Sequence, residues 1–273
     1  MSLAAIARAN QQIISRGGYR APSGREVELR AAVARARAGT RLYVPEELGA
    51  LLERDGPGGQ PPTVEVWTDK TGEAARRLAQ QSGGPVALLN FASARNPGGG
   101  YLRGARAQEE DLSRCSALHE ALLTQPGYYE ANRACRSLLY TDHMIYSPGV
   151  PFFRDEGYEL LEEAVHLAVI TAPAPNAGEV LRRDADAGPA IEAALRRRAG
   201  MVLAVAADQD QRQLVLGAWG CGVFRNDPSL VADAFGTWLA DPRFVGAFDR
   251  VVFAVWSRGG AGPTLEAFRA RFS

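Results

Sequence analysis

Apolar residues follow two different patterns along the chain, and the change falls near residue 60. In residues 26–38 and 45–54 they recur at helical spacing, whereas no segment before residue 56 shows the clear alternation of a strand. Residues 56–62 are rich in glycine and proline, which interrupt regular structure. The pattern predicts a helical N-terminal extension over residues 1–62, followed by a second unit over residues 63–273.

Beyond residue 62, short apolar runs alternate with longer stretches of helical periodicity. The runs with strand character lie at residues 63–67, 85–91, 143–147, 165–171, 213–218 and 249–257. The helical stretches lie at residues 70–82, 108–123, 189–207, 228–240 and 263–271. Strands separated by helices indicate an α/β fold in which helices cover both faces of a sheet. Ligands of such sheets usually bind where loops leave the carboxyl ends of the strands.

Two glycine-rich loops each follow one of these predicted strands. The first loop consists of Asn96, Pro97, Gly98, Gly99 and Gly100. The second spans residues 217–224 and includes Gly220, Cys221, Gly222, Val223 and Phe224. Glycine backbone can approach a ligand closely and can aim several N–H groups at one anion. A single loop of this kind is more often a plain tight turn, but two at strand ends favour a diphosphate site. Neither loop has the glycine spacing of the common nucleotide-binding motifs.

The trio Gln108, Glu109 and Glu110 opens a predicted helix, and seven residues separate it from Gly100. Acidic residues are common in a first helical turn because they complement the helix dipole. A carboxylate beside a bound diphosphate, however, would have a raised pKa and would suit general acid catalysis at neutral pH. Adjacent helical residues point about 100° apart, so one carboxylate can do chemistry while the other holds the substrate.

The three glycines, the seven-residue gap and the trio resemble the signature of poly(ADP-ribose) glycohydrolases of the short bacterial type. The resemblance extends to further stretches, at residues 90–97, 146–154, 170–176 and 216–222, and covers most of the chain from about residue 64 onward. It implies a macrodomain-like fold, a mixed β-sheet flanked by helices that binds ADP-ribose. The implied activity is hydrolysis of the ribose–ribose O-glycosidic bonds of poly(ADP-ribose), and a role in recovery from DNA damage is implied with it.

The resemblance also implies roles for individual residues. Glu110 would be the catalytic acid/base, while Glu109 and Gln108 would position the ribose and the polymer chain. Gly98, Gly99 and Gly100 would hold the diphosphate together with Gly220, Cys221, Gly222 and Val223. Phe224 would stack near the adenosine, and Asn96 would contact a ribose hydroxyl.

Two other functions remain open from the sequence: a macrodomain that only binds ADP-ribose, and a hydrolase that removes single ADP-ribose groups from proteins. The two carboxylates beside a diphosphate loop speak against pure binding. Other residues suggest weaker alternatives, since Cys115 and His119 share a helical face as metal ligands can, and Cys221 could be a nucleophile. Core packing is the more common role for such residues, so we expect neither a metal nor a cofactor.

Aromatic residues outside the loops are expected to have structural roles. The four tryptophans, Trp67, Trp219, Trp238 and Trp256, lie in or beside predicted elements and are expected in the core. Tyr128 and Tyr129 follow a Pro-Gly pair, so contact with the substrate and a position in a surface loop are both open.

Composition limits the partners and the compartment. The 31 basic and 31 acidic residues give no net charge, which argues against binding to long or sequence-specific nucleic acid and requires a polyanion to be held locally. Three cysteines cannot build a disulfide framework, and neither a signal peptide nor a membrane segment is evident. We therefore expect a cytoplasmic monomer whose partners are poly(ADP-ribose), ADP-ribose and ADP-ribosylated proteins.

Overall fold

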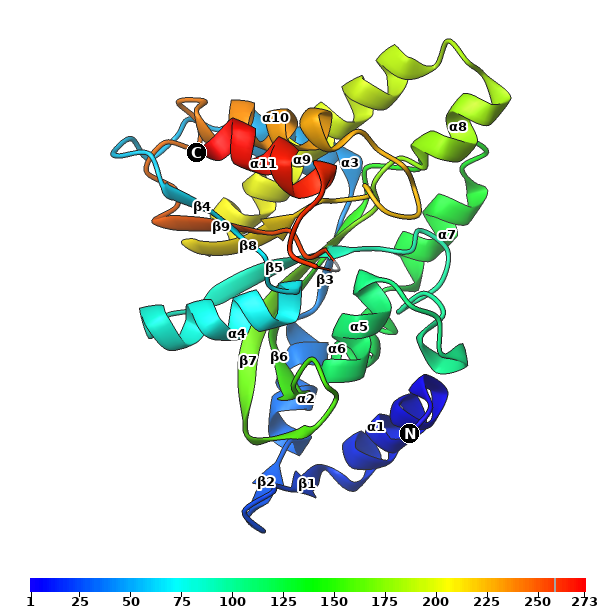
Figure 1. The fold of residues 1–273 in the computed structure, drawn as a ribbon, viewed down its shortest axis with the longest axis vertical. Helices are drawn as coiled ribbons and strands as arrows, with labels where there is room; N and C mark the ends of the chain where they lie inside the picture. The colour runs from blue at the N-terminus through cyan, green and yellow to red at the C-terminus, as the bar shows by residue number, and fades with distance from the viewer. Residues whose placement is uncertain (258) are drawn as a thin grey trace.

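A seven-stranded mixed β-sheet forms the centre of the computed structural model, which describes residues 1–257 and 259–273 (Figure 1). In spatial order its strands are β3 (Arg41–Tyr43), β6 (Met144–Arg154), β7 (Leu160–Ala172), β5 (Val86–Phe91), β8 (Gln213–Gly217), β9 (Arg250–Ala254) and β4 (Thr63–Trp67). The pairs β3–β6 and β6–β7 are antiparallel, and every pair from β7 to β4 is parallel. This sheet confirms the predicted fold class.

Helices cover both faces of the sheet, as the alternation of elements predicts (Figure 1). The helices of one face are α3 (Pro45–Leu52), α9 (Gly188–Asp208), α10 (Pro228–Leu239) and α11 (Pro263–Phe272). Those packed into the core of the other face are α2 (Arg30–Gly39), α4 (Thr71–Ser82), α5 (Gln108–Cys115), α6 (Leu118–Leu122) and α7 (Pro126–Ala134). A further short helix is α8 (Ala177–Arg183).

The central strand β5 is apolar except for Asn90, because it is buried on both sides. Ala87 and Leu89 point into one core, whereas Val86 and Leu88 point into the other. Parallel strands covered on both faces lack the apolar–polar alternation of half-exposed strands, which is why the sequence shows a continuous run here.

The N-terminal segment is not purely helical, which corrects the prediction. Besides α1 (Leu3–Arg16), α2 and α3 it contains the antiparallel pair β1 (Gly18–Arg20) and β2 (Glu26–Glu28), as well as β3. Strands of three residues are too short to show a period of two in the sequence. Because β3 pairs with β6 in the main sheet, part of the segment is integrated with the rest of the fold; the division at residue 62 stays a prediction.

Helix α1 is attached to the rest of the protein by a buried asparagine. The side chain of Asn10 is fully buried, donates to the Arg114 carbonyl oxygen at 2.6 Å and accepts from the Arg154 Nε–H at 2.7 Å. The Tyr101 hydroxyl, in the short 3-10 helix η1 (Tyr101–Arg103), donates to the Ala7 carbonyl at 3.3 Å. The first helix thereby supports the segment between the first glycine loop and α5.

The helix predicted over residues 108–123 is divided into α5 and α6. Ser116 adopts an extended conformation between them and forms an isolated β-bridge with Phe152 of β6. Its hydroxyl donates to the Leu112 carbonyl at 2.7 Å and accepts from the Leu118 N–H at 3.1 Å, so the break is satisfied by hydrogen bonds. The apolar spacing continues across the break, which explains why the sequence predicts one helix.

Other predicted elements differ in extent. Strands predicted at residues 143–147 and 165–171 are the cores of the longer β6 and β7, and a register shift between Ser147 and Val150 absorbs the intervening proline and glycine. Helix α7 was not predicted, and it buries Tyr128 and Tyr129 almost completely, so their position in a surface loop is wrong.

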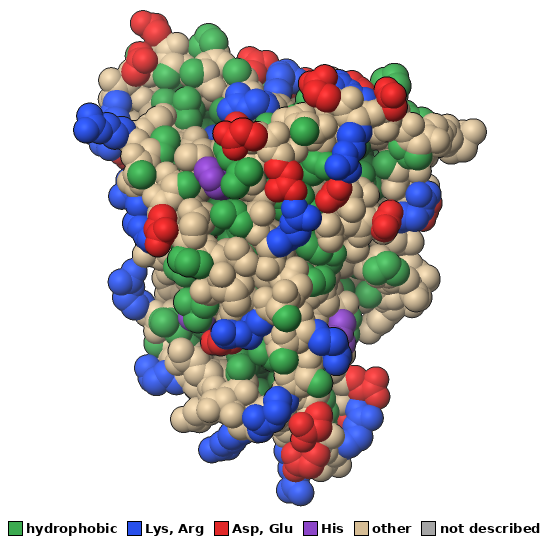
Figure 2. Space-filling model, turned by 180° about the vertical axis from the view of Figure 1, so that it is seen from behind, with side chains coloured by type: hydrophobic (Ala, Val, Ile, Leu, Met, Phe, Trp, Pro, Cys, Tyr) green, Lys and Arg blue, Asp and Glu red, His purple; other side chains and the backbone are tan. Residues whose placement is uncertain are grey.

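Acidic and basic side chains alternate over the face shown in Figure 2, with no broad region of one sign. Many charged side chains of the described residues form ion pairs, as between Arg212 and Asp249 or between Arg243 and Asp241. None of the described helices combines the length and apolar character needed to cross a lipid bilayer.

We expect Asn10→Leu to destabilise the fold by about 2 kcal/mol, because the Arg154 Nε–H loses its acceptor and the Arg114 carbonyl loses its donor. Urea unfolding would measure this. The matched control is Gln12→Leu at an exposed position of the same helix, expected to change stability by less than about 0.5 kcal/mol. Equal effects of the two substitutions would contradict the role of Asn10.

Candidate functional site

Both glycine-rich loops leave the same edge of the sheet. The first follows β5 and the second follows β8, and these two strands are neighbouring and parallel. Their carboxyl ends therefore lie side by side, which places the loops together at the edge where the ligands of such sheets bind. Helix α5 also begins at this edge, because its first residue is hydrogen-bonded to the end of β5.

Gln108 fixes the start of α5 to the sheet. Its side-chain oxygen accepts the Phe91 N–H at 2.8 Å, and its amide donates to the Leu89 carbonyl at 2.7 Å and to the Thr71 hydroxyl at 3.2 Å. The amide thus extends the backbone pairing of β5. In this structure Gln108 holds the two following glutamates in place, and its predicted contact with the substrate stays a prediction.

Glu109 is buried, with 2% of its surface exposed. One carboxylate oxygen accepts from the Asn90 amide at 3.1 Å and the other from the Ser93 N–H at 2.7 Å. Burial raises the pKa of Glu109 to about 8, although these hydrogen bonds act in the opposite direction. The carboxyl is therefore mostly neutral at pH 7.

Glu110 lies at the same edge, with one carboxylate oxygen accepting the Gly100 N–H at 2.8 Å. The loop backbone passes directly against both glutamates. A Cβ built on Gly99 would lie 2.4 Å from a carboxylate oxygen of Glu110 and 3.2 Å from one of Glu109, and the φ angle of Gly99 is +58°. Only glycine satisfies both conditions, so the triple glycine is explained first by its contact with the carboxylates.

The N–H groups of the first loop are engaged within the protein. Gly99 donates to the Asn96 carbonyl at 3.0 Å, Gly100 donates to Glu110, and the backbone of Gly98 hydrogen-bonds to Glu109. These N–H groups were expected to bind an anion, whereas in the structure they hold the two glutamates. The contact of the loop with a diphosphate stays a prediction. The exposed Asn96 supplies the carbonyl of this turn, and its contact with a ribose also stays a prediction.

The second loop is held by a buried asparagine, Asn226, which lies two residues before α10. The Asn226 amide donates to the carbonyls of Pro175 at 2.9 Å and of Gly220 at 3.1 Å. Gly220 has a φ angle of +72°, and a Cβ there would lie 2.4 Å from the Asn226 amide nitrogen. The fully buried Trp219 donates to the Ala172 carbonyl at 3.1 Å, as expected of a core residue.

The side chains that follow differ in environment. Burial raises the pKa of the Cys221 thiol to about 12, so the thiol is neutral at pH 7 and does not suit a nucleophile. Val223 is 78% exposed at the tip, and Phe224 is partly buried. The Phe224 ring lies 6.0 Å from the Tyr140 ring, centroid to centroid, so two aromatic side chains stand at this end of the site.

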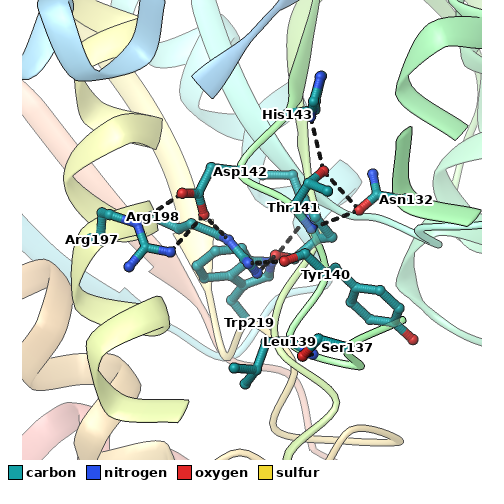
Figure 3. A network of polar contacts seen from close by, with 12 residues as sticks. Asn132, Ser137, Leu139, Tyr140, Thr141, Asp142, His143, Arg197, Arg198 and Trp219 are labelled. Atoms are coloured by element: carbon teal, nitrogen blue, oxygen red, sulfur yellow. Dashed lines mark hydrogen bonds and ion pairs between the residues drawn. The ribbon is translucent and has the colours of Figure 1, made fainter. Parts of the chain in front are cut away.

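A buried arginine holds the segment that carries Tyr140 (Figure 3). Arg198 of α9 donates to the Tyr140 carbonyl at 2.8 Å, to the Pro173 carbonyl at 3.0 Å and to the Asp142 carboxylate at 2.6 Å. Its side chain is 1% exposed, and Arg197 pairs with the same carboxylate at 2.8 Å. Neither Arg198 nor Tyr140 stood out in the sequence, because a lone arginine in a helix has no distinguishing pattern.

No metal-ligand cluster of three histidine, cysteine or acidic residues is found in residues 1–257 and 259–273. Cys115 directs its thiol to the Asp155 carbonyl at 3.2 Å. His119 lies instead behind the first loop, where its Cδ2 would be 3.0 Å from a Cβ at Gly98.

Trp256 is not in the core, which corrects the prediction for this residue. It is 55% exposed, whereas Trp67 is 9% exposed and Trp238 is partly buried. It lies two residues beyond the end of β9, and its neighbours in the sequence do not indicate how much of the ring is exposed.

Comparison with known proteins gives a consistent result. A family model described as the catalytic domain of microbial-type PARG matches residues 7–155. The structure is similar to that of poly(ADP-ribose) glycohydrolase from Thermomonospora curvata, with 49% identity over 99% of each chain and a TM-score of 0.94. The same enzyme bound to the inhibitor ADP-HPD matches at 49% identity over 99% of each chain, with a TM-score of 0.89.

A third similar structure is the poly(ADP-ribose) glycohydrolase from Deinococcus radiodurans in complex with ADP-ribose. It is 48% identical, covers 88% of this chain and 96% of its own, and has a TM-score of 0.81. A comparison with curated proteins gave no match.

The raised pKa of Glu109 predicts a pH-dependent stability. The folded state holds a proton that the unfolded state releases near pH 4.5, so stability should fall as the pH rises from about 4.5 to about 8. The slope is at most about 1.4 kcal/mol per pH unit. Urea unfolding at a series of pH values would measure this slope, which should be present in the wild-type protein and lost in Glu109→Gln. The control Glu130→Gln, at an exposed position, should keep the slope. Parallel pH profiles would contradict the assignment.

Proposed function

Because the chain belongs to the family of microbial-type poly(ADP-ribose) glycohydrolases, we propose that Glu110 is the acid/base that cleaves the ribose–ribose bonds of poly(ADP-ribose). The observation that carries this role is the position of Glu110 under Gly99. One carboxylate oxygen is held by the Gly100 N–H, at the sheet edge where both loops meet. Family membership decides for hydrolysis of the polymer over a macrodomain that only binds ADP-ribose.

In the proposed reaction the protonated Glu110 donates its proton to the oxygen that links the two ribose units. The bond between the anomeric carbon and that oxygen breaks through an oxocarbenium-like state, and the shortened polymer leaves as an alcohol. A water molecule then adds to the anomeric carbon and gives its proton to the Glu110 carboxylate. The products are ADP-ribose and a polymer with a free ribose hydroxyl, and the acid is restored.

Glu109 is better suited to positioning than to proton transfer. Both of its oxygens accept hydrogen bonds inside the protein, from Asn90 and Ser93, and little of its surface is exposed. Its raised pKa also keeps a second negative charge away from Glu110 at neutral pH. Glu109 would orient the ribose, with Gln108 maintaining the helix start.

The remaining site residues are assigned by their place on the two loops. The diphosphate would lie between the first loop, at Gly98–Gly100, and the second, at Gly220–Val223, where it would stabilise the positive charge that develops on the sugar. Phe224 and Tyr140 would contact the adenosine, because their rings lie together at the second loop. Asn96, exposed beside the first loop, would reach a ribose hydroxyl.

We also propose that the protein acts as a cytoplasmic monomer on ADP-ribosylated proteins, in recovery from DNA damage. All three cysteines are free thiols, which suits a reducing compartment. Sedimentation in solution tests whether the protein is a monomer. The role in recovery from DNA damage is tested by deleting the gene, exposing the cells to a DNA-damaging agent and measuring how much poly(ADP-ribose) accumulates.

We expect Glu110→Gln to lower kcat about 10²–10⁴-fold, because the amide keeps the shape of the carboxyl but cannot supply the proton. The assay incubates a polymer-bearing acceptor protein and identifies the products. Free ADP-ribose with one unit left on the acceptor supports the proposed reaction, whereas complete removal indicates a hydrolase of single ADP-ribose groups. Unchanged turnover by Glu110→Gln would exclude its acid/base role.

Gly99→Ala should lower kcat about 100-fold, because its Cβ would displace the Glu110 carboxylate. Gly149→Ala is the matched control. It has a similar φ angle of +54° but no atom within 4 Å of the added Cβ, so it carries the backbone cost without the clash. Equal losses of activity in the two variants would show that backbone strain, not contact with Glu110, is responsible.

A further inference from the structure

An exposed tryptophan lies at the same edge of the sheet as the site. Trp256 follows β9, whose last residue, Ala254, pairs with Gly217 at the start of the second loop. On its other side the Val255 N–H donates to the Trp67 carbonyl at the end of β4. The strand ends therefore place Trp256 one strand away from the second loop, with 55% of its surface exposed.

The only lysine of the sequence lies beside this ring. The Nζ of Lys70 is 5.7 Å from the centroid of the Trp256 ring and 3.2 Å from the Asp111 carboxylate. Asp111 follows Glu110 directly, and it also pairs with the fully buried Arg114 at 3.1 Å. The three charged groups carry a net positive charge. The side chains of Lys70 and Asp111 are similarly exposed, at 31% and 30%, whereas Arg114 is buried, so Lys70 is the cation of this cluster that a ligand can reach.

Lys70 is also close to the start of the catalytic helix through its neighbour. It precedes α4, and the hydroxyl of the next residue, Thr71, accepts from the Gln108 amide at 3.2 Å. The indole and the ammonium thus lie near the start of α5, the helix that carries Glu110.

An exposed indole beside a cation has the chemistry to bind a base and a phosphate. A cation–π contact at an exposed site contributes only about 0.5–1 kcal/mol. This contact by itself does not explain why a large apolar ring is exposed to water. Proteins that bind single-stranded nucleic acids stack successive bases on such rings and place cations along the phosphates. Poly(ADP-ribose) repeats an adenine and a diphosphate in every unit, so it can satisfy both groups at once.

We propose that Trp256 and Lys70 form a second subsite, which binds the adenine and a phosphate of the unit that leaves when the bond is cut. The proposal rests on the proposed function, since it takes the polymer as substrate. The leaving oxygen belongs to the adenosine ribose of the next unit, so that unit's adenine is attached to the sugar next to Glu110. Its base then stacks on Trp256, and its phosphate approaches Lys70.

Two substrates distinguish the contribution of this subsite to KM from that of the site that binds the released ADP-ribose. One is the ADP-ribose dimer, and the other carries the same ADP-ribose linked to a plain ribose that lacks adenine and phosphate. The wild-type protein should have the lower KM for the dimer. Trp256→Ala should raise KM for the dimer about 5–150-fold, the range that base stacking provides, and leave KM for the ribose-linked substrate within about twofold.

Further variants test the chemistry of the subsite. Trp256→Phe should restore part of the affinity for the dimer, because it keeps an aromatic face, and kcat should stay within about twofold in all of these variants. Lys70→Gln should raise KM for the dimer less than Trp256→Ala does. It should also weaken the dependence of this KM on the salt concentration. Leu123→Ala, at an apolar position that is 48% exposed, is the matched control and should change neither KM.

Tryptophan fluorescence gives a direct readout of stacking. Of the other three tryptophans, Trp67 and Trp219 are buried and Trp238 is partly buried, so quenching by a stacked adenine should come from Trp256. The dimer, added to Glu110→Gln protein, should quench the emission. The ribose-linked substrate, which has no adenine in its leaving part, should not, and the quenching by the dimer should be lost when Trp256→Phe is added to Glu110→Gln.

The outcomes distinguish the two proposals. Equal KM values of the wild-type protein for both substrates, or an equal effect of Trp256→Ala on both, would overturn the subsite and leave the function intact. Absence of hydrolysis of either substrate by the wild-type protein would instead overturn the proposed function.

Discussion

The close approach of glycine backbone to two buried carboxylates is the constraint on which the site depends. Gly99 passes within contact distance of Glu109 and Glu110, and the Gly100 N–H holds one oxygen of Glu110. The backbone takes the space that any side chain would fill, so the loop and the start of α5 form a single unit. A diphosphate bound over this loop would lie next to Glu110 without any flexible side chain between them.

The rest of the fold keeps this unit in place from three directions. Gln108 attaches the helix start to β5, Asn10 attaches α1 to the segment that carries Arg114, and Ser116 ends α5 by pairing with Phe152. Each of these polar side chains satisfies backbone groups that would otherwise be buried without partners. The start and the end of α5 and the segment beside it are thus held in place by side-chain hydrogen bonds to backbone groups.

The second wall of the site is held by a separate set of buried polar groups. Asn226 braces Gly220, and Arg198 reaches from α9 to the carbonyls of Tyr140 and Pro173. A guanidinium with 1% exposure is stable here because a carboxylate and two carbonyls accept its hydrogen bonds. The two walls approach one another only because β5 and β8 are adjacent and parallel.

The sequence by itself determined the class of fold, the two loops and the trio at the helix start, because these features are local. Glycine runs, a continuous apolar strand and acidic residues at a helix N-terminus are all visible within a few residues of chain. It did not determine the three-residue strands of the N-terminal segment, the break at Ser116 or the burial of Tyr128 and Tyr129 in α7. Each of those depends on a partner far away in the sequence.

The tertiary structure alone decided how the site residues are divided between chemistry and support. Glu109 and Glu110 are equivalent neighbours in the sequence, yet burial among Asn90 and Ser93 gives one of them a raised pKa and two internal hydrogen bonds. Trp256 resembles the other tryptophans in its surroundings along the chain, and only the packing leaves it exposed beside Lys70. Desolvation and contact are properties of three-dimensional neighbours, and a single sequence does not specify which neighbours a side chain will have.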